Sequence, residues 1–343
     1  MEKVVFQKQL GSIAEKNQRV AKLAGTVATQ LNANIDYVQR AALLSKSVLM
    51  TNMVGEFASL QGVMGKRYAQ VAGEEEEVAI ALDEQYKPRG ASDDTASTTT
   101  GQILSISDKL DTLVGIFAIG QKPTGEKDPY ALRRASLGVL RTIIERQLDL
   151  DLKQLIATSA KLLADKVDAS KIEQEVFDYI LERLRAYYLD RGIMPDVFDA
   201  VSALSPSRPL DVDKRIKAVT AFRELSAAES LAAANKRVAN ILKKSATNET
   251  LLVDEKLLSE DAEKKLYQVL NDLSKVVEPM FDSGDYESAL SQLSLLREPV
   301  DVFFDSVMVM ADDEAIKNNR IALLSIMNQL FLRAGDLSRL HQS

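Results

Sequence analysis

The chain has 343 residues and a formal net charge of −7 at neutral pH, with 46% hydrophobic and 27% charged residues. This balance is typical of a folded globular protein, and it argues against a disordered chain or one coated with basic charge for nonspecific nucleic-acid binding. The absence of cysteine excludes disulfides and thiolate metal sites, and no apolar run approaches the roughly 18 residues that span a bilayer, so we expect a cytoplasmic protein with no membrane partner.

Helical periodicity dominates the chain, which predicts an all-α fold. In the first part, apolar residues recur at three- and four-residue steps, and a run of glutamates after Gly73 indicates the start of a further helix. The segment PRGASDDTASTTTG has almost no apolar residue and is typical of a surface loop. We predict helices over 12–32, 35–60 and 102–119, and a further one that Pro129 starts, with its amphipathic pattern over 130–147.

The second part of the chain continues the helical pattern beyond a proline-rich break. Pro206 and Pro209 interrupt it and indicate a domain boundary, and Pro279 and Pro299 should kink or divide the helices that contain them. Further helices are predicted over 152–166, 171–190, 195–203, 212–245, 259–282, 285–310 and 313–335. We therefore divide the chain into a helical domain over 1–150, a helical linker over 151–208 and a helical bundle over 209–343.

Histidine is nearly absent from the chain. The single one, His341, is near the C-terminus, where we expect a solvated tail. Histidine is the usual general base near neutral pH and the commonest metal ligand, so a catalytic site would have to use carboxylates, lysines or hydroxyls. A hydrolytic site is therefore disfavoured.

Three segments on predicted helices resemble, in their order, the HD superfamily: KNQRVAKLAGTVA, AALLSKSVLMTNMV and ISDKLDTLVGIF. The resemblance implies that Lys16 occupies the place of the first metal-binding histidine, that Ser45 and Lys46 replace the His-Asp pair, and that Asp108 matches the last ligand. One carboxylate cannot hold a divalent ion, and a lysine adds repulsion. We expect a degenerate HD-like domain with no metal, and an HD-type metal phosphohydrolase is a disfavoured alternative.

Four blocks resemble, in the family's order, the β subunit of bacterial glycine–tRNA ligase: AALLSKSVLMTNMVGEFASLQGVMGKRYA, IGQKPTGEKDPYALRRASLGVLR, AAANKRVANIL and VDVFFDSVMVMADD. The β chain of that family is longer, so we expect Met1 to mark a boundary within it, with the N-terminal half of the β subunit missing. The resemblance implies an ATP- and Mg-dependent aminoacyl-tRNA synthetase whose catalytic site lies on a separate α subunit. This chain is therefore expected to be non-catalytic and to bind no cofactor of its own.

The same resemblance implies the partners and the fold of the C-terminal part. The HD-like part would approach the acceptor arm of tRNA(Gly). The C-terminal bundle, similar to the anticodon-binding domain of arginine–tRNA ligase, would lie near the anticodon, and the α subunit would bind as a protein partner. A purely structural scaffold for the α subunit is the remaining alternative.

Two basic zones are the candidate tRNA contacts. Arg134 and Arg141 are seven residues apart and return to one helix face, with Arg133 beside them. Solvated or salt-bridged arginines are the alternative, and the resemblance favours tRNA contact. The second zone, 208–249, has nine basic and five acidic residues. Phe222 and Arg237 are its candidates for base stacking, and packing in the core is the more common role for a residue such as Phe222. Its candidates, partly implied by the ANKRVANIL block, are Asn235, Lys236, Arg237, Lys243 and Lys244.

Overall fold

The computed structural model describes residues 1–245 and 252–340, and His341 lies outside these ranges. Over the described residues the chain is helical apart from one short antiparallel hairpin, β1 (Val5–Gln7) and β2 (Gly11–Ser12), which confirms the predicted all-α class. The helices form two compact units. The N-terminal unit comprises Met1–Tyr187 and Ser207–Leu210, and the C-terminal unit comprises Tyr188–Pro206 and Asp211–Ser343.

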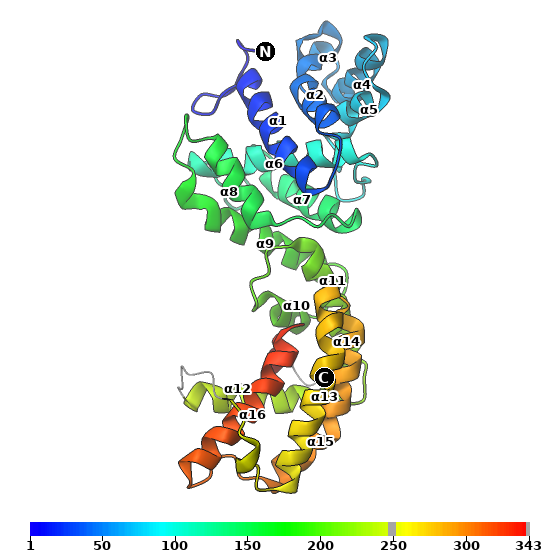
Figure 1. Cartoon of the computed structure of the whole chain (residues 1–343). Coiled ribbons are helices and arrows are strands. Elements are labelled where there is room, and N and C mark those ends of the chain that lie inside the picture. Colours follow the sequence, from blue (N-terminus) through cyan, green and yellow to red (C-terminus); the bar gives the residue numbers. More distant parts are fainter. Residues whose placement is uncertain (246–251, 341–343) are drawn as a thin grey trace. The chain divides into compact units, whose positions relative to one another are not determined.

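The N-terminal unit has one central helix surrounded by others. Its helices are α1 (Ile13–Gln30), α2 (Ile35–Leu44), α3 (Asn52–Glu56), α4 (Gln61–Val71), α5 (Glu76–Glu84), α6 (Thr99–Ala118), α7 (Leu132–Glu145), α8 (Leu152–Leu162) and most of α9 (Glu173–Leu189), with 3-10 turns η1 (Ser47–Met50), η2 (Ala58–Leu60) and η3 (Ser170–Ile172). Helix α6 packs against α1, α2, α5, α7 and α8 (Figure 1). Because α6 meets neighbours on several sides, it is buried around most of its circumference.

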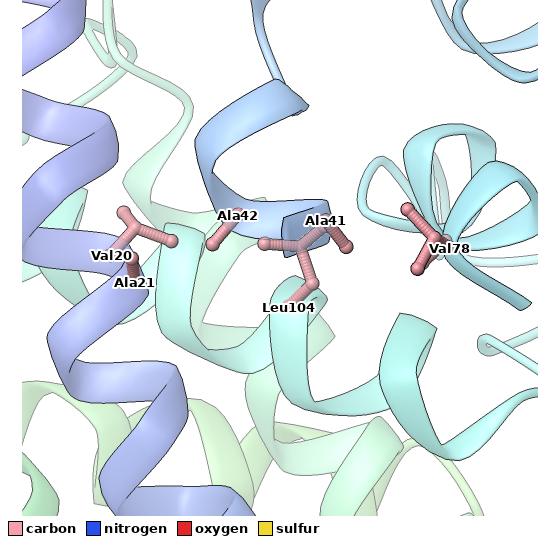
Figure 2. Packing of buried hydrophobic residues seen from close by; sticks show 7 residues of the cluster. Val20, Ala21, Ala41, Ala42, Val78 and Leu104 are labelled. Carbon is pink, nitrogen blue, oxygen red and sulfur yellow. The ribbon is translucent and has the colours of Figure 1, made fainter. Parts of the chain in front are cut away.

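Small side chains let these helices approach closely. Figure 2 shows the packing between α1, α2, α5 and α6, where the buried residues are Val20, Ala21, Ala41, Ala42, Val78 and Leu104. An alanine has no atom beyond Cβ, so α1 and α2 can pack closely without leaving a void. This packing holds α1 and the end of α2 against α6, from which the polar groups described below project.

The continuous helix predicted over 35–60 is wrong, because hydroxyl side chains interrupt it. The Ser45 and Ser47 hydroxyls donate to the carbonyls of Ala42 and Leu44, at 2.8 and 2.7 Å. The Thr51 hydroxyl then caps the separate helix α3. Such side-chain bonds compete with helical backbone bonds, so the segment forms α2, η1, α3 and η2 in turn.

Helix α7 does not begin at Pro129, which corrects a second prediction. The helix begins at Leu132, after Ala131 in the left-handed region with φ of 53°. The carboxylate of Asp128 accepts from the backbone N–H groups of Leu132 and Arg133, at 2.8 and 3.0 Å. Asp128 therefore satisfies the free donors of the first turn, and Pro129 lies in the preceding turn.

The C-terminal unit is a helical bundle. It contains α10 (Pro195–Ser202), most of α11 (Pro209–Arg223), α12 (Ala228–Ser245), α13 (Asp261–Ser283), α14 (Tyr286–Leu293), α15 (Arg297–Ser306) and α16 (Glu314–Leu332), with 3-10 turns η4 (Glu255–Leu257), η5 (Ser294–Leu296) and η6 (Leu337–Arg339). Helix α12 packs against α15, α16 and η6, and α13 packs against α14, α15 and α16. Across the described ranges, none of the helices combines the length and apolarity needed to cross a lipid bilayer.

Two long helices predicted in this unit are each divided. The predicted helix 212–245 breaks between α11 and α12, where backbone bonds of the turn type link residues three apart, such as Leu225 to Phe222. The predicted helix 285–310 divides at η5. Pro299 lies in the first turn of α15, where its missing N–H costs little, whereas Pro279 lies inside an undivided α13. The three-part division at 150 and 208 stays a prediction.

Candidate nucleic-acid interface

Three of the four HD-like positions meet in one buried ion cluster of the N-terminal unit. Lys16 from α1 and Lys46, next to η1, hold opposite oxygens of the Asp108 carboxylate on α6. The distances from Nζ to oxygen are 2.8 Å for Lys16 and 3.2 Å for Lys46. The two lysines are only 3% and 7% exposed. Ser45 is buried beside them, but its hydroxyl bonds to Asn17 and to its own helix instead.

A second carboxylate, Asp111, completes the cluster. It lies one turn after Asp108 on α6, forms an ion pair with Arg19 at 2.7 Å and lies 3.3 Å from the Lys16 ammonium. The Lys46 ammonium also donates to the Gln85 side chain at 2.6 Å. Sequence reasoning missed Arg19 and Asp111. Their three-residue spacing from Lys16 and from Asp108, which puts each pair on one helix face, was the available signal.

Both oxygens of the Asp108 carboxylate are neutralised within the cluster. Burial raises the pKa of the Asp108 carboxyl, but the ammonium groups of Lys16 and Lys46 outweigh this effect and hold the pKa well below its ordinary value. Asp108 is therefore ionised at neutral pH, with a cation on each oxygen. In the part of the chain that the structure describes, no three histidine, cysteine, aspartate or glutamate side chains are placed to share a metal ion. The arrangement suits a structural ion network.

Arg141, which we predicted to contact tRNA, is instead buried in the protein interior. It is 8% exposed. Its guanidinium donates to the Glu145 carboxylate, at 2.7 Å from Nε, and to the carbonyls of Gly90, Ala91 and Asp93. These bonds use all five N–H donors of an arginine. No donor is left for a phosphate, so we correct the prediction and assign Arg141 to anchoring the loop over residues 90–93.

The other two arginines of α7 differ from Arg141. Arg133 donates to the carbonyl of Gly125. Arg134 is exposed, and within the described part of the chain its one hydrogen bond is a long one of 3.5 Å to the carbonyl of Arg89. Neither forms an ion pair with a carboxylate among the residues that the structure covers. Both guanidinium groups keep donors for an external anion.

Arg134 also borders a cavity of about 500 Å³ in the N-terminal unit. The cavity extends to Asp108, so the buried ion cluster forms part of its wall. Lys109 and Arg89 contribute two further cations to the lining. Arg134 is thus both exposed at the surface and part of the cavity lining.

The C-terminal basic zone separates into paired and unpaired charges. Four of its basic residues form ion pairs with carboxylates: Arg208, Arg215, Lys217 and Arg223. The predicted residues of α12 differ, since the exposed side chains of Lys236, Arg237, Lys243 and Lys244 have no carboxylate partner within residues 1–245 and 252–340. The free positive charge of the zone is therefore concentrated on α12.

Two candidate residues of this zone point inward, which corrects the assignment of Asn235 and agrees with the core alternative for Phe222. Asn235 is 2% exposed, and its amide donates to the carbonyl of Leu231 at 2.8 Å. Phe222 is 1% exposed and packs edge-on against Phe331 in the core. Neither side chain can reach a nucleic acid. The aromatic surface near α12 comes instead from Phe304, whose ring lies under the Arg237 guanidinium at 4.2 Å.

Comparison with known proteins finds matches over both units. The family model described as glycyl-tRNA synthetase beta subunit matches residues 1–203, and the DALR anticodon binding domain matches residues 231–337. The glycine–tRNA ligase beta subunit of Aliivibrio fischeri strain ES114 is 53% identical over 342 residues, which cover 100% of this chain and 50% of that protein.

Two further relatives have the same name. The protein of Vibrio campbellii is 52% identical, with 49% of its length covered, and that of Pseudoalteromonas translucida is 51% identical, with 50% covered. The chain thus spans about half the length of the curated relatives that it matches. The resemblance stated from the sequence is confirmed, and the chain belongs to the glycyl-tRNA synthetase β-subunit family.

Proposed function

We propose that this chain binds tRNA(Gly) as part of the β subunit of glycine–tRNA ligase and positions it for aminoacylation by the α subunit. The observation that carries the proposal is the set of exposed cations on α12 that have no carboxylate partner among the described residues, inside the segment that matches an anticodon-binding domain. The family membership supports the same role. The α subunit as partner and tRNA(Gly) as substrate follow from the names of the relatives. These relatives are about twice as long as the segment that this chain matches.

The α12 surface has the chemistry that RNA binding needs. Lysine and arginine side chains that neutralise phosphates release counterions, which makes affinity fall as salt rises. Arg237, stacked on Phe304, adds a planar cation beside an aromatic ring, and unpaired bases stack on such surfaces. A folded RNA with phosphates and an unpaired loop is the ligand that uses both features.

The catalytic contribution in this proposal is positioning. A correctly held tRNA end converts the transfer of glycine into an effectively intramolecular step, which lowers its barrier. ATP and magnesium would be used by the α subunit. We assign no proton transfer and no group transfer to residues of this chain.

The test is a tRNA-binding titration at two salt concentrations, comparing glycine-specific tRNA with an unrelated tRNA. The variant replaces Lys236, Arg237, Lys243 and Lys244 with alanine. We expect its affinity to fall at least about tenfold and its salt dependence to weaken by about one unit of slope for each lost phosphate contact. The helical circular dichroism signal should not change, because these side chains are exposed.

A matched control removes four exposed cations elsewhere in the same unit. Replacing Lys264, Lys265, Lys275 and Arg333 with alanine makes the same change in charge, and Arg333 also lies over an aromatic ring, that of Phe281. The control should bind tRNA like the parent chain. Equal affinity of the α12 variant would reject this placement of the interface. An absence of salt-dependent tRNA binding by the parent chain would favour the structural scaffold.

A further inference from the structure

One surface of the N-terminal unit carries large apolar side chains that are exposed. It is formed by α3, η2 and α4, which follow one another in the chain, pack together and lie at one edge of the unit (Figure 1). Within α3 and η2, Val54 alone is buried. We call this surface the apolar face and define it by the exposed side chains of Met53, Phe57, Leu60, Val63, Tyr68 and Val71.

Helix α4 has its small residues inside and its large apolar residues outside. Gly62, Gly65 and Ala69 recur at three- and four-residue steps, and they are the buried residues of the helix. The outer side of α4 belongs to the apolar face, where Val71 is 88% exposed. A surface helix with one packed side normally has the opposite pattern. The outer side of α4 therefore has the composition of a second buried side, although no segment among the described residues covers it.

A hollow of about 280 Å³ borders the apolar face and is lined by residues of η1, α4 and α5. Val48, Ala69 and Leu82 belong to its lining, and Tyr68 belongs both to the lining and to the apolar face. At interfaces between proteins, the side chains that contribute most to binding fill well-packed pockets on the partner. The hollow therefore gives the apolar face a point at which an apolar side chain of a partner can be anchored.

The apolar face has almost no charge that could attract a distant partner. The segment over 47–65 contains one charged residue, Glu56, in a chain with 27% charged residues. Beside the face, Lys66 pairs with Glu76 at 3.8 Å and Arg40 pairs with Glu74 at 2.5 Å. Proteins that meet by diffusion use charge to steer their encounter, whereas a domain in the same polypeptide needs no steering. The composition of the face thus favours a tethered partner.

We propose that the apolar face is the docking site of the remaining half of the β subunit, the part of the relatives that this chain does not match. In those relatives a polypeptide of similar length is covalently joined to the matched segment. Because tethering raises the effective concentration, interfaces between domains of one chain are stable at a smaller size than those between free proteins. The inference rests on this chain being part of a β subunit and does not depend on tRNA binding.

The test uses the absence of cysteine, which lets one introduced thiol report the exposure of its own position. Val63→Cys places the thiol in the apolar face. Val276→Cys on α13 is the control, because it replaces a valine of similar exposure, 45% against 50%. Each variant is made in the 343-residue chain and in a chimera in which this chain replaces the matched half of the Aliivibrio fischeri β subunit. Labelling by iodoacetamide is followed by mass spectrometry of the peptide that contains the thiol.

In the chimera, Val63→Cys should be labelled at least about tenfold more slowly than in the 343-residue chain, because the docked state would be about ten times as populated as the open one. Val276→Cys should react at the same rate in both proteins. Adding Val71→Glu to the chimera should restore fast labelling of Val63→Cys, since it places a charge in the docked face. In the 343-residue chain, Val71→Glu should leave the urea midpoint unchanged because Val71 is exposed.

Equal labelling of Val63→Cys in the two proteins would overturn the inference. Slowing that requires added α subunit, or that grows with the concentration of the 343-residue chain alone, would also overturn it, because the occupant would then be the α subunit or a second copy. If the chimera does not fold, hydrogen exchange in the full-length Aliivibrio fischeri β subunit takes its place. The segment aligned with α4 should then exchange at least about tenfold more slowly than α4 in the 343-residue chain, with α16 as the reference, and equal rates would contradict docking.

The α12 variant separates this inference from the proposed function. In the chimera it should lose tRNA affinity and leave the labelling of Val63→Cys slow. Slow labelling without any tRNA binding by the parent protein would support docking and reject the proposed role in tRNA binding. Fast labelling together with tRNA binding that depends on α12 would reject docking alone.

Discussion

Replacing Asp108 with asparagine should destabilise the N-terminal unit by about 3 kcal/mol, because removing one partner of a buried ion pair leaves buried charge uncompensated. The contacts of the two lysines set this magnitude. Lys46 would keep the Gln85 side chain at 2.6 Å and the ring of Tyr86, but it would have no carboxylate partner among the residues that the structure describes. Lys16 would keep Asp111 at 3.3 Å. Since only one of the two ammonium groups loses its sole counterion, we expect the lower end of the usual cost.

Urea unfolding followed by helical circular dichroism measures this effect. The two units allow two transitions, so a three-state fit is needed, and only one transition should shift. The double variant Asp108→Asn, Lys46→Met should be more stable than Asp108→Asn alone, because it also removes the uncompensated ammonium. Asp272→Asn is the control, since its exposed pair with Lys275 at 3.7 Å should be worth no more than about 0.5 kcal/mol.

The effect should depend on pH in one direction. The folded pKa of Asp108 lies below its ordinary value of 3.8, so its contribution is fully present above that pH and is lost as the pH falls towards the folded pKa. The stability difference between parent and Asp108→Asn should be constant near neutral pH and shrink in acid. A cost under about 1 kcal/mol at pH 7, or a double variant no more stable than the single one, would refute the reasoning.

Three further predictions concern single residues in either unit. Lys109→Met should remove a pH dependence of stability. The folded pKa of Lys109, about 7, is below its ordinary 10.5, so the parent becomes more stable relative to the variant as the pH rises from about 7 to 10.5. Urea midpoints measured at several pH values test this, and a difference that does not change with pH would contradict it. Arg320→Met should destabilise the C-terminal unit by about 3 kcal/mol, because it leaves the fully buried Glu263 without the guanidinium 2.5 Å away; an unshifted urea midpoint would contradict this. Gly284→Ala should cost about 1 kcal/mol by thermal melting, since Gly284 ends α13 at φ of 75°, and an unchanged melting temperature would count against strain there.

Most helices were predictable from the sequence because amphipathic spacing is a local property. The predicted helix over 12–32 lies close to α1, and that over 313–335 lies close to α16. The breaks between helices were harder to predict from the sequence. Ser45 and Ser47 end α2 by bonding to backbone carbonyls, although the apolar spacing continues through the segment. Spacing alone therefore reports which face is buried and not where a side chain interrupts the backbone.

For the candidate sites too, the sequence does not show which distant segments pack over a given side chain. The resemblance to the HD superfamily assigned Lys16, Lys46 and Asp108 to ligand positions of one lost metal site, and the structure brings these three side chains together. For α7, helical geometry placed Arg134 and Arg141 on one face. It could not show that the loop over 90–93 covers Arg141 and takes up its donors. Burial of an individual arginine depends on which distant segment packs over it, and a single sequence does not contain that information.

The central charge of the N-terminal unit is supplied by lysine side chains, which are attached to the backbone. An ammonium of this kind cannot dissociate, be exchanged for another ion or be stripped by a chelator. The two cations beside Asp108 are therefore in place as soon as the polypeptide has folded. We therefore expect dialysis against EDTA to leave the urea midpoint of the N-terminal unit unchanged.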